Sequence, residues 1–243
     1  LDMEFDGLGI MIAIALAVQY GKLPPWYLLL GVSRPLFVLG MWLLKRAGKP
    51  VYDLAPSDHR RIIAGLQTSF VAVTLWPVLA AQITLFASYL MAVPLVLSFG
   101  RDWLVVSGFV DPTAAAYQAR RSATKRIVEG WLPLAARILG AGLTLLLVGQ
   151  DGLFAGPNLL WLIAAFLLLT GVLSRVAALV LTVFACIVMT AAGLQLDNAL
   201  LLACTIAVLH LGGGRLAFWS PEERPLHSKL GAPRSTGGDD ATW

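Results

Sequence analysis

The amino-acid sequence predicts an all-α, polytopic integral membrane protein of about eight transmembrane helices in two groups of four. Composition is the first observation: of 243 residues, 58% are hydrophobic and only 13% are charged, whereas soluble domains average roughly 25% charged residues. Secondly, apolar runs close to the roughly 20 residues that a helix needs to cross the hydrocarbon recur along the chain. Thirdly, the connections between these runs alternate in positive charge, which is typical of polytopic membrane proteins.

The apolar runs define the predicted spans. Several are shorter than 20 residues, so we expect nearly upright helices or extra turns contributed by the neighbouring loops. In chain order the spans are 5–20, 26–44, 62–79, 83–99, 131–148, 159–173, 176–192 and 198–211.

Basic residues predict the orientation. The positive-inside rule places the basic connections, and with them both termini, in the cytoplasm, so the protein is expected in the cell (inner) membrane. Because this placement explains the net charge of +4, no nucleic-acid partner is expected. The basic connections carry Lys45, Arg46, Lys49, Arg60, Arg61, Arg101, Arg120, Arg121, Lys125, Arg126, Arg175 and four tail residues, whereas the opposite connections carry only Lys22.

A polar, basic segment separates the two groups of helices. The predicted organisation is a first membrane domain at 1–106, a basic interfacial linker at 107–129, a second membrane domain at 130–219 and a disordered cytoplasmic tail at 220–243. Within the linker, Pro112 and the Ala- and Arg-rich run after it favour a short helix on the membrane surface; a plain solvated linker is the alternative. The tail is rich in Pro, Gly, Ser and charge, a composition typical of disorder.

Two acidic residues open the first predicted helix. Asp2 and Asp6 are four residues apart, so on a helix their carboxylates lie on one face, one turn apart, whereas Glu4 points to another side. Two carboxylates in this register suit a hard divalent cation such as Mg²⁺ or Mn²⁺. The alternative is an acidic cap that interacts favourably with the helix dipole.

Basic and polar residues are predicted near the same membrane face. Arg34 lies inside the second span before Pro35, where a charge usually faces a polar cavity or a partner. Arg60 and Arg61 open the third span, which is a good arrangement for phosphate, although anchoring by the positive-inside rule explains them equally well. Gln67 follows two turns later and is either a substrate contact or a bond to a neighbouring helix.

Several runs in residues 1–105 resemble the CDP-alcohol phosphatidyltransferase family. The run DMEFD (2–6) is similar to the closing half of the family signature, D-x2-D-G-x2-A-R followed by G-x3-D-x3-D. The run RRIIAGLQ (60–67) resembles the basic-then-Gln entry of a later helix, and GVSRPLFV (31–38) and SFGRD (98–102) resemble bacterial members. The resemblance covers the last four of the family's six helices. Since the opening half and the glycine before Asp2 are absent, and the chain begins at Leu1, we expect a fragment.

The resemblance implies a metal-dependent transferase of phospholipid synthesis. Such an enzyme moves a phosphatidyl or phospho-alcohol group from a CDP-linked donor to a small alcohol acceptor at the bilayer and releases CMP. Asp2 would be a metal ligand, and Asp6 the general base and a further ligand, with Mg²⁺ or Mn²⁺ as cofactor. Arg34 and Arg61 would hold the phosphate or polar head of the acceptor, with Arg60 and Gln67 as further substrate-binding residues. A homodimer is one open possibility.

The second group of helices resembles DoxX-like four-helix membrane domains. The resemblance rests on SRVAAL (174–179) and GGGRL (212–216), with Arg137 inside the first helix and Asp197 at the far turn. It implies no activity. The glycines are expected to end a helix, or to permit close backbone approach to a headgroup or another helix.

The competing hypothesis is a non-enzymatic membrane protein, either a small-solute carrier or a structural subunit, in which Asp2 and Asp6 cap a helix. A carrier is expected to have polar or broken helices near the midplane. Apart from Arg34-Pro35 and Pro94, the predicted spans contain little of this kind. The enzymatic hypothesis also explains why acidic and basic residues are predicted at one face.

Overall fold

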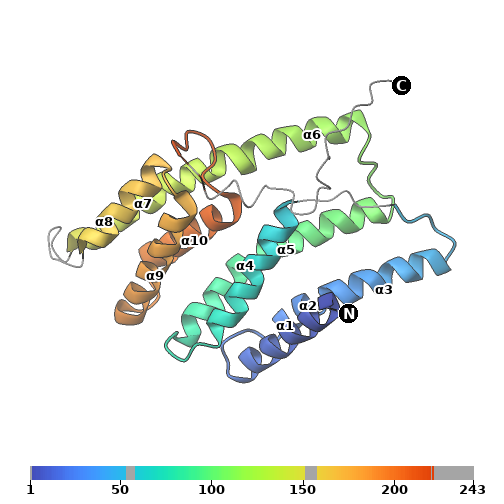
Figure 1. The fold of residues 1–243 in the computed structure, drawn as a ribbon, viewed down its shortest axis with the longest axis horizontal. Helices are drawn as coiled ribbons and strands as arrows, with labels where there is room; N and C mark the ends of the chain where they lie inside the picture. The colour runs from blue at the N-terminus through green and yellow to red at the C-terminus, as the bar shows by residue number, and fades with distance from the viewer. Residues whose placement is uncertain (1, 53–57, 151–157, 220, 222–243) are drawn as a thin grey trace, which may run out of the picture.

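A computed structural model describes residues 2–52, 58–150, 158–219 and 221, with side chains except at 2–6, 58–59 and 150. Within these ranges the chain is all-α (Figure 1). Its elements are α1 (Asp2–Gln19), α2 (Tyr27–Gly31), α3 (Ser33–Arg46), α4 (Asp58–Thr74), α5 (Ala81–Val106), α6 (Ala115–Lys125), the π-helical turn η1 (Arg126–Trp131), α7 (Leu132–Gln150), α8 (Asn158–Thr170), α9 (Ser174–Ala192) and α10 (Leu196–Leu211).

Each predicted apolar segment contains helix, and among the described residues three helices are long and apolar enough to cross a membrane. They are α5, α9 and the continuous 35-residue helix Ala115–Gly149, which α6, η1 and α7 form together. Three shorter apolar helices, Gly7–Gln19, Asn158–Thr170 and Leu196–Leu211, lie among them. The structure thus supports a membrane protein built from helices.

The second predicted span is interrupted. Helix α2 ends at Gly31, and α3 starts at Ser33 after Val32, whose φ of −94° and ψ of 5° leave the helical region. Pro35 explains the break, because a proline has no backbone N–H to donate to the carbonyl four residues earlier, and its ring crowds that carbonyl. The hydroxyl of Ser33 donates to the Leu30 carbonyl at 2.6 Å and satisfies part of the open turn. Pro35 therefore accounts for a break inside the second predicted span.

Helices α7 to α10 pack as a four-helix bundle, with α10 against α7 and α9 and with α8 against the same two helices. A reciprocal cap formed by Gln195 and Asn198 starts α10, so that free N–H groups of its first turn are satisfied. Gly212, with φ of 81°, follows its last residue. The expectation that a glycine of the 212–214 run ends a helix is confirmed, since this conformation favours glycine.

The two groups of helices share a core. Ile83, Ala87 and Met91 of α5 belong to the same buried cluster as Leu181 of α9 and Leu201 of α10. A smaller cluster joins α1, α2, α4 and α5. Helix α5 therefore belongs to both clusters, and it packs on α4 on one side and on α9 and α10 on the other.

The predicted linker is mostly helical. Near its start, Asp111 accepts hydrogen bonds from the hydroxyl of Thr113 at 2.7 Å and from the backbone N–H of Thr113 at 2.8 Å, and these bonds hold the pKa of the Asp111 carboxyl below its usual value. Helix α6 then continues through η1 into α7 along one line (Figure 1). Interfacial placement of this segment stays a prediction, and the tail predicted at 220–243 lies outside the described residues apart from residue 221.

Candidate functional site

Helices α1 and α4 run in the same direction, and this arrangement places the start of each at the same end of the molecule. The turn after α1 meets the loop after α4, where the ammonium group of Lys22 donates to the Leu79 carbonyl, 57 residues further along the chain. Ile14 of α1 and Val71 of α4 are also 57 residues apart in the sequence, and both belong to the smaller core cluster. With both helices in this register, the start of α1 lies level with the start of α4.

The acidic pair lies at this common end. Asp2 and Asp6 belong to α1, which is helical from Asp2 onward, so their Cα positions fall on one face of the helix, one turn apart. Their side chains lie outside the described part of the structure. The i, i+4 register on which the predicted metal site depends is thus confirmed, whereas the metal site itself stays a prediction. Among the described side chains, no group of three or more His, Cys, Asp or Glu residues could hold a metal ion.

Arg34 is brought toward the start of α1 by the packing of α2. A Cβ added to Gly31 would lie 3.0 Å from the Cδ1 of Ile14 and 3.8 Å from the Cα of Met11. Gly31 therefore lies directly on α1, and the chain then continues toward the end where α1 starts. Arg34, three residues later in the first turn of α3, is exposed. It thus lies two residues after the break at Val32, on the side of α1 toward its acidic start.

Arg60 and Arg61 have different surroundings. Arg60 forms an ion pair with Asp102 of α5, with 3.4 Å between Nη1 and Oδ2, and the Asp102 side chain is 11% exposed. Arg61, the next residue, is exposed. A guanidinium that already neutralises a nearly buried carboxylate has less capacity for a substrate phosphate than an exposed one. Of the two predicted phosphate contacts, Arg61 is thus the one better suited to an external anion.

Gln67 is used inside the protein. Its Oε1 accepts a hydrogen bond from the hydroxyl of Tyr27 at 2.6 Å, and its amide nitrogen donates to the carbonyl of Met91. Gln67 is 8% exposed and Tyr27 is 1% exposed. The amide links α2, α4 and α5, so the alternative expected from the sequence, a bond to neighbouring helices, is confirmed. The predicted substrate contact of Gln67 stays untested.

Asp102 and Tyr27 contact the predicted site residues Arg60 and Gln67, and neither was among the predicted site residues. Asp102 lies in the SFGRD run, directly after the basic Arg101 and in the part of α5 expected near the cytoplasmic face, which is a usable signal for an ion pair with Arg60. Tyr27 has no comparable signal, because an aromatic residue at the start of an apolar helix is common in membrane proteins. Only the packing reveals its bond to Gln67.

Arg137 is the most deeply buried charged residue of the described structure, at 1% exposure. Its Nε donates to the Leu168 carbonyl at 2.8 Å and its Nη2 to the Leu169 carbonyl at 2.7 Å, both in the last turn of α8. Its Nη1 donates to the Gly213 carbonyl at 2.7 Å, just after α10 ends. The carbonyl ends of two helices, which carry partial negative charge, therefore surround the guanidinium. These hydrogen bonds join three parts of the bundle, so the buried charge of Arg137 is accounted for by a role in stabilising the fold.

Glycines make room for this arrangement. A Cβ on Gly171, whose φ is 76°, would lie 2.5 Å from the Nη2 of Arg137, and a Cβ on Gly214 would lie 2.7 Å from the Cβ of Pro133. Both distances are too short for a real side chain. The expected close backbone approach of a glycine in the 212–214 run is confirmed at Gly214, where the neighbour is the start of α7.

The start of α1, the first turn of α3 and the start of α4 thus lie toward the same end of the first group of helices. Oppositely charged groups at a common end can bind a nucleotide pyrophosphate through a cation and through guanidinium groups. Comparison with protein-family models, with curated proteins and with solved structures gives no match for this chain.

Proposed function

We propose that this chain belongs to a metal-dependent membrane phosphotransferase of phospholipid synthesis and carries the closing half of its motif. In this proposal a phosphatidyl or phospho-alcohol group moves from a CDP-linked donor to a small alcohol, with release of CMP. The observation that carries the proposal is the common end of α1 and α4, where Asp2 and Asp6 start one helix and Arg60 and Arg61 start the other. The resemblance of the DMEFD and RRIIAGLQ runs to the CDP-alcohol phosphatidyltransferases supplies the reaction.

In the proposed reaction Asp6 accepts the proton of the alcohol hydroxyl, because an alcohol is a poor nucleophile until a base removes that proton. The alcohol oxygen then forms a bond to the phosphorus that carries the transferred group, while the bond from this phosphorus to the CMP oxygen breaks. CMP leaves with the electron pair of that bond. The exposed Arg34 and Arg61 hold the phosphate or polar head of the acceptor.

The donor set fits Mg²⁺ or Mn²⁺. Two carboxylates one helical turn apart offer the oxygen ligands that hard cations prefer, so Asp2 and Asp6 are the residues that would hold the ion. When bound, such an ion neutralises the charge of the pyrophosphate and of the departing CMP.

The membrane arrangement proposed for this function has eight spans, with the start of α1, the start of α4 and the basic linker in the cytoplasm. The charge difference between alternate connections supports this orientation. The active face then opens to the cytoplasm, where CDP-linked donors and soluble alcohols are available, while lipid chains stay in the bilayer.

Release of CMP tests the proposal. The full-length protein in lipid vesicles is expected to release CMP from a CDP-linked substrate only with Mg²⁺ or Mn²⁺, and Asp6→Asn is expected to abolish turnover while the melting temperature is kept. Glu4→Gln is the matched control, because Glu4 lies on another side of the same helix. Equal turnover in wild type and Asp6→Asn removes Asp6 from the mechanism.

A second candidate is a non-enzymatic membrane protein with an acidic helix cap. The observation that favours it is the internal use of two predicted site residues, since Arg60 pairs with Asp102 and Gln67 bonds to Tyr27 and Met91. Under this alternative no CDP-linked substrate turns over with any divalent cation, and Asp2→Asn and Asp6→Asn change only stability, by about 1 kcal/mol or less.

A further inference from the structure

A groove runs along the outer face of α7 in the second group of helices. One part, with a volume of about 730 Å³, is lined only by apolar residues and glycines, which are Ile138, Leu139, Gly142, Leu143, Leu145, Leu146 and Gly149. A second part of about 400 Å³ shares Leu143 and lies against the start of α10. Gly142 and Gly149 shape the groove, because a Cβ added to either would meet nothing within 4 Å.

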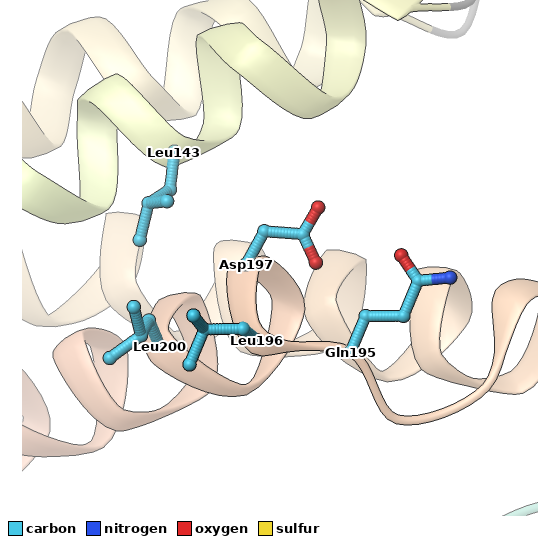
Figure 2. A pocket seen from close by; sticks show the side chains of 5 residues that line it. All are labelled: Leu143, Gln195, Leu196, Asp197 and Leu200. Atoms are coloured by element: carbon cyan, nitrogen blue, oxygen red, sulfur yellow. The ribbon is translucent and has the colours of Figure 1, made fainter.

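The second part of the groove is apolar on one side and polar on the other. Leu143, Leu196 and Leu200 gather on one side, and the polar ends of Asp197 and Gln195 lie on the other (Figure 2). Asp197 uses Oδ1 to accept the backbone N–H of Asn198 at 2.7 Å. Across the described residues, Oδ2 of Asp197 has no hydrogen bond or ion pair, so one oxygen of this carboxylate is available to a ligand.

The length of the groove matches one lipid leaflet. A Cβ on Gly140 would lie 3.4 Å from the Cβ of Cys204 and 3.9 Å from the Cδ1 of Leu201, so these residues are level. Arg137, nearer the start of α7, bonds to the Gly213 carbonyl just after the end of α10, so the two helices run antiparallel. Asp197 is one turn before Leu201 and is therefore about level with the last two turns of α7. The groove extends along α7 from Ile138 to Gly149, which is roughly 16 Å at about 1.5 Å per residue. Half of the roughly 30 Å hydrocarbon core is about 15 Å.

We propose that this groove binds a phospholipid whose headgroup carries a primary ammonium. One acyl chain lies along α7 over Gly142, where the exposed leucines of the same helix border it. The ammonium donates to Oδ2 of Asp197, and the second amide hydrogen of Gln195, whose other donor bonds to the Ala192 carbonyl at 3.3 Å, reaches a phosphate oxygen. The negative charge of Asp197 favours a headgroup with an ammonium, whereas the apolar lining of the groove accommodates an acyl chain. This inference is independent of the proposed transferase activity.

Lipid titration with the purified full chain, followed by native mass spectrometry, tests the proposal. The probes are phosphatidylethanolamine and phosphatidylglycerol with identical chains, since both have a phosphate and only the first has an ammonium. We expect the apparent Kd for phosphatidylethanolamine to be about tenfold lower, as one charge-assisted hydrogen bond provides. Asp197→Asn is expected to remove this difference while it keeps the Oδ1 acceptor for Asn198. Gly142→Leu is expected to weaken binding of both lipids, because it fills the path of the chain.

Two control variants complete the design. Asp111→Asn removes another carboxylate that accepts backbone N–H bonds, and Gly65→Leu adds the same side chain to a helix at a position with open space; both are expected to leave the lipid preference unchanged. Leucine has a higher helix propensity than glycine, so a loss of lipid binding in Gly142→Leu would not be caused by unfolding of α7. Equal affinity of the wild type for the two lipids, or a preference that survives Asp197→Asn, overturns the proposal.

Discussion

Gly142 and Gly171 are glycines of the same bundle with opposite surroundings. A Cβ on Gly142 meets nothing within 4 Å, whereas a Cβ on Gly171 would lie 2.5 Å from Arg137 and 2.6 Å from the Cα of Ala217. Gly171 also has a φ of 76°, which other residues rarely adopt. Gly142 is thus a partly exposed helix position with open space beside it, whereas Gly171 is required by the buried guanidinium next to it.

The same substitution is therefore expected to have opposite effects at these two positions. Gly142→Ala is expected to stabilise the protein by about 0.5–1 kcal/mol, because alanine loses less conformational freedom in a helix. Gly171→Ala is expected to destabilise it by about 2 kcal/mol or more through backbone strain and displacement of Arg137. Thermal melts of both variants in one detergent check the prediction, and two shifts of the same sign would contradict it.

Neighbouring arginines are expected to respond differently to the same change. Arg61→Ala is expected to raise the KM for the alcohol acceptor severalfold with little change in stability, because Arg61 is exposed. Arg60→Ala is expected to cost about 1–2 kcal/mol of unfolding free energy, because it removes the ion-pair partner of the nearly buried Asp102. Acceptor kinetics and melts of both variants are the measurements. Unchanged kinetics in Arg61→Ala would return that residue to a role in topology alone.

At the scale of helices, Gln67 connects three elements of the first group. Tyr27 on α2 donates to it, and it donates to Met91 on α5, while its own helix is α4. Polar side chains of this kind hold helices together where lipid removes most of the hydrophobic driving force between them. The break between α2 and α3 therefore does not leave α2 loose, since the Tyr27 bond fixes the short helix to its neighbours.

A double-mutant cycle tests this connection. Gln67→Leu is expected to destabilise the protein by about 1–3 kcal/mol, because the buried Tyr27 hydroxyl and the Met91 carbonyl lose their partner. Tyr27→Phe together with Gln67→Leu is expected to cost less than the sum of the two single changes, since both remove the same bond. Strictly additive costs in denaturation experiments would show that the bond contributes nothing.

The elements were more predictable than their contacts. Hydrophobic runs located the helices because a membrane span requires one continuous apolar segment, and Pro35 located the break because its missing N–H acts within its own chain. The partner of Arg60 depends on how α4 meets α5, which a charge pattern in one sequence does not determine. For the same reason the sequence marked Arg137 as a charge within a span but gave no sign of its partners, which are backbone carbonyls that every residue has.

At the scale of the whole molecule, α5 joins the two groups of helices into one packed unit. Ile83, Ala87 and Met91 lie in the cluster that contains the core of the second bundle, whereas Ala92, the next residue, lies in the cluster of α1, α2 and α4. Sequence composition divided the chain at its polar segment, but composition carries no information on packing between the groups. The shared core predicts that the two groups unfold together.

Cysteine accessibility tests the orientation of the whole chain. In a Cys186→Ala, Cys204→Ala background, Gln195→Cys is expected to react with a membrane-impermeant thiol reagent added to intact cells, because it lies in the turn between α9 and α10. Arg121→Cys, in the exposed basic helix α6, is expected to react only after the cells are opened. The positive-inside rule provides the reason. The reverse pattern would invert the topology.

The single long helix formed by α6, η1 and α7 spans about 52 Å at about 1.5 Å per residue, well beyond a hydrocarbon core of roughly 30 Å. With the start of this helix on the membrane surface, as predicted, its first half would act as a lever on α7. A force on the arginines near its first residues is then expected to change the tilt of α7, and with it the contacts of α7 with α8 and α10. Its π-helical turn, which holds more residues per turn than an ordinary one, also sets the rotational position of those arginines relative to the bundle.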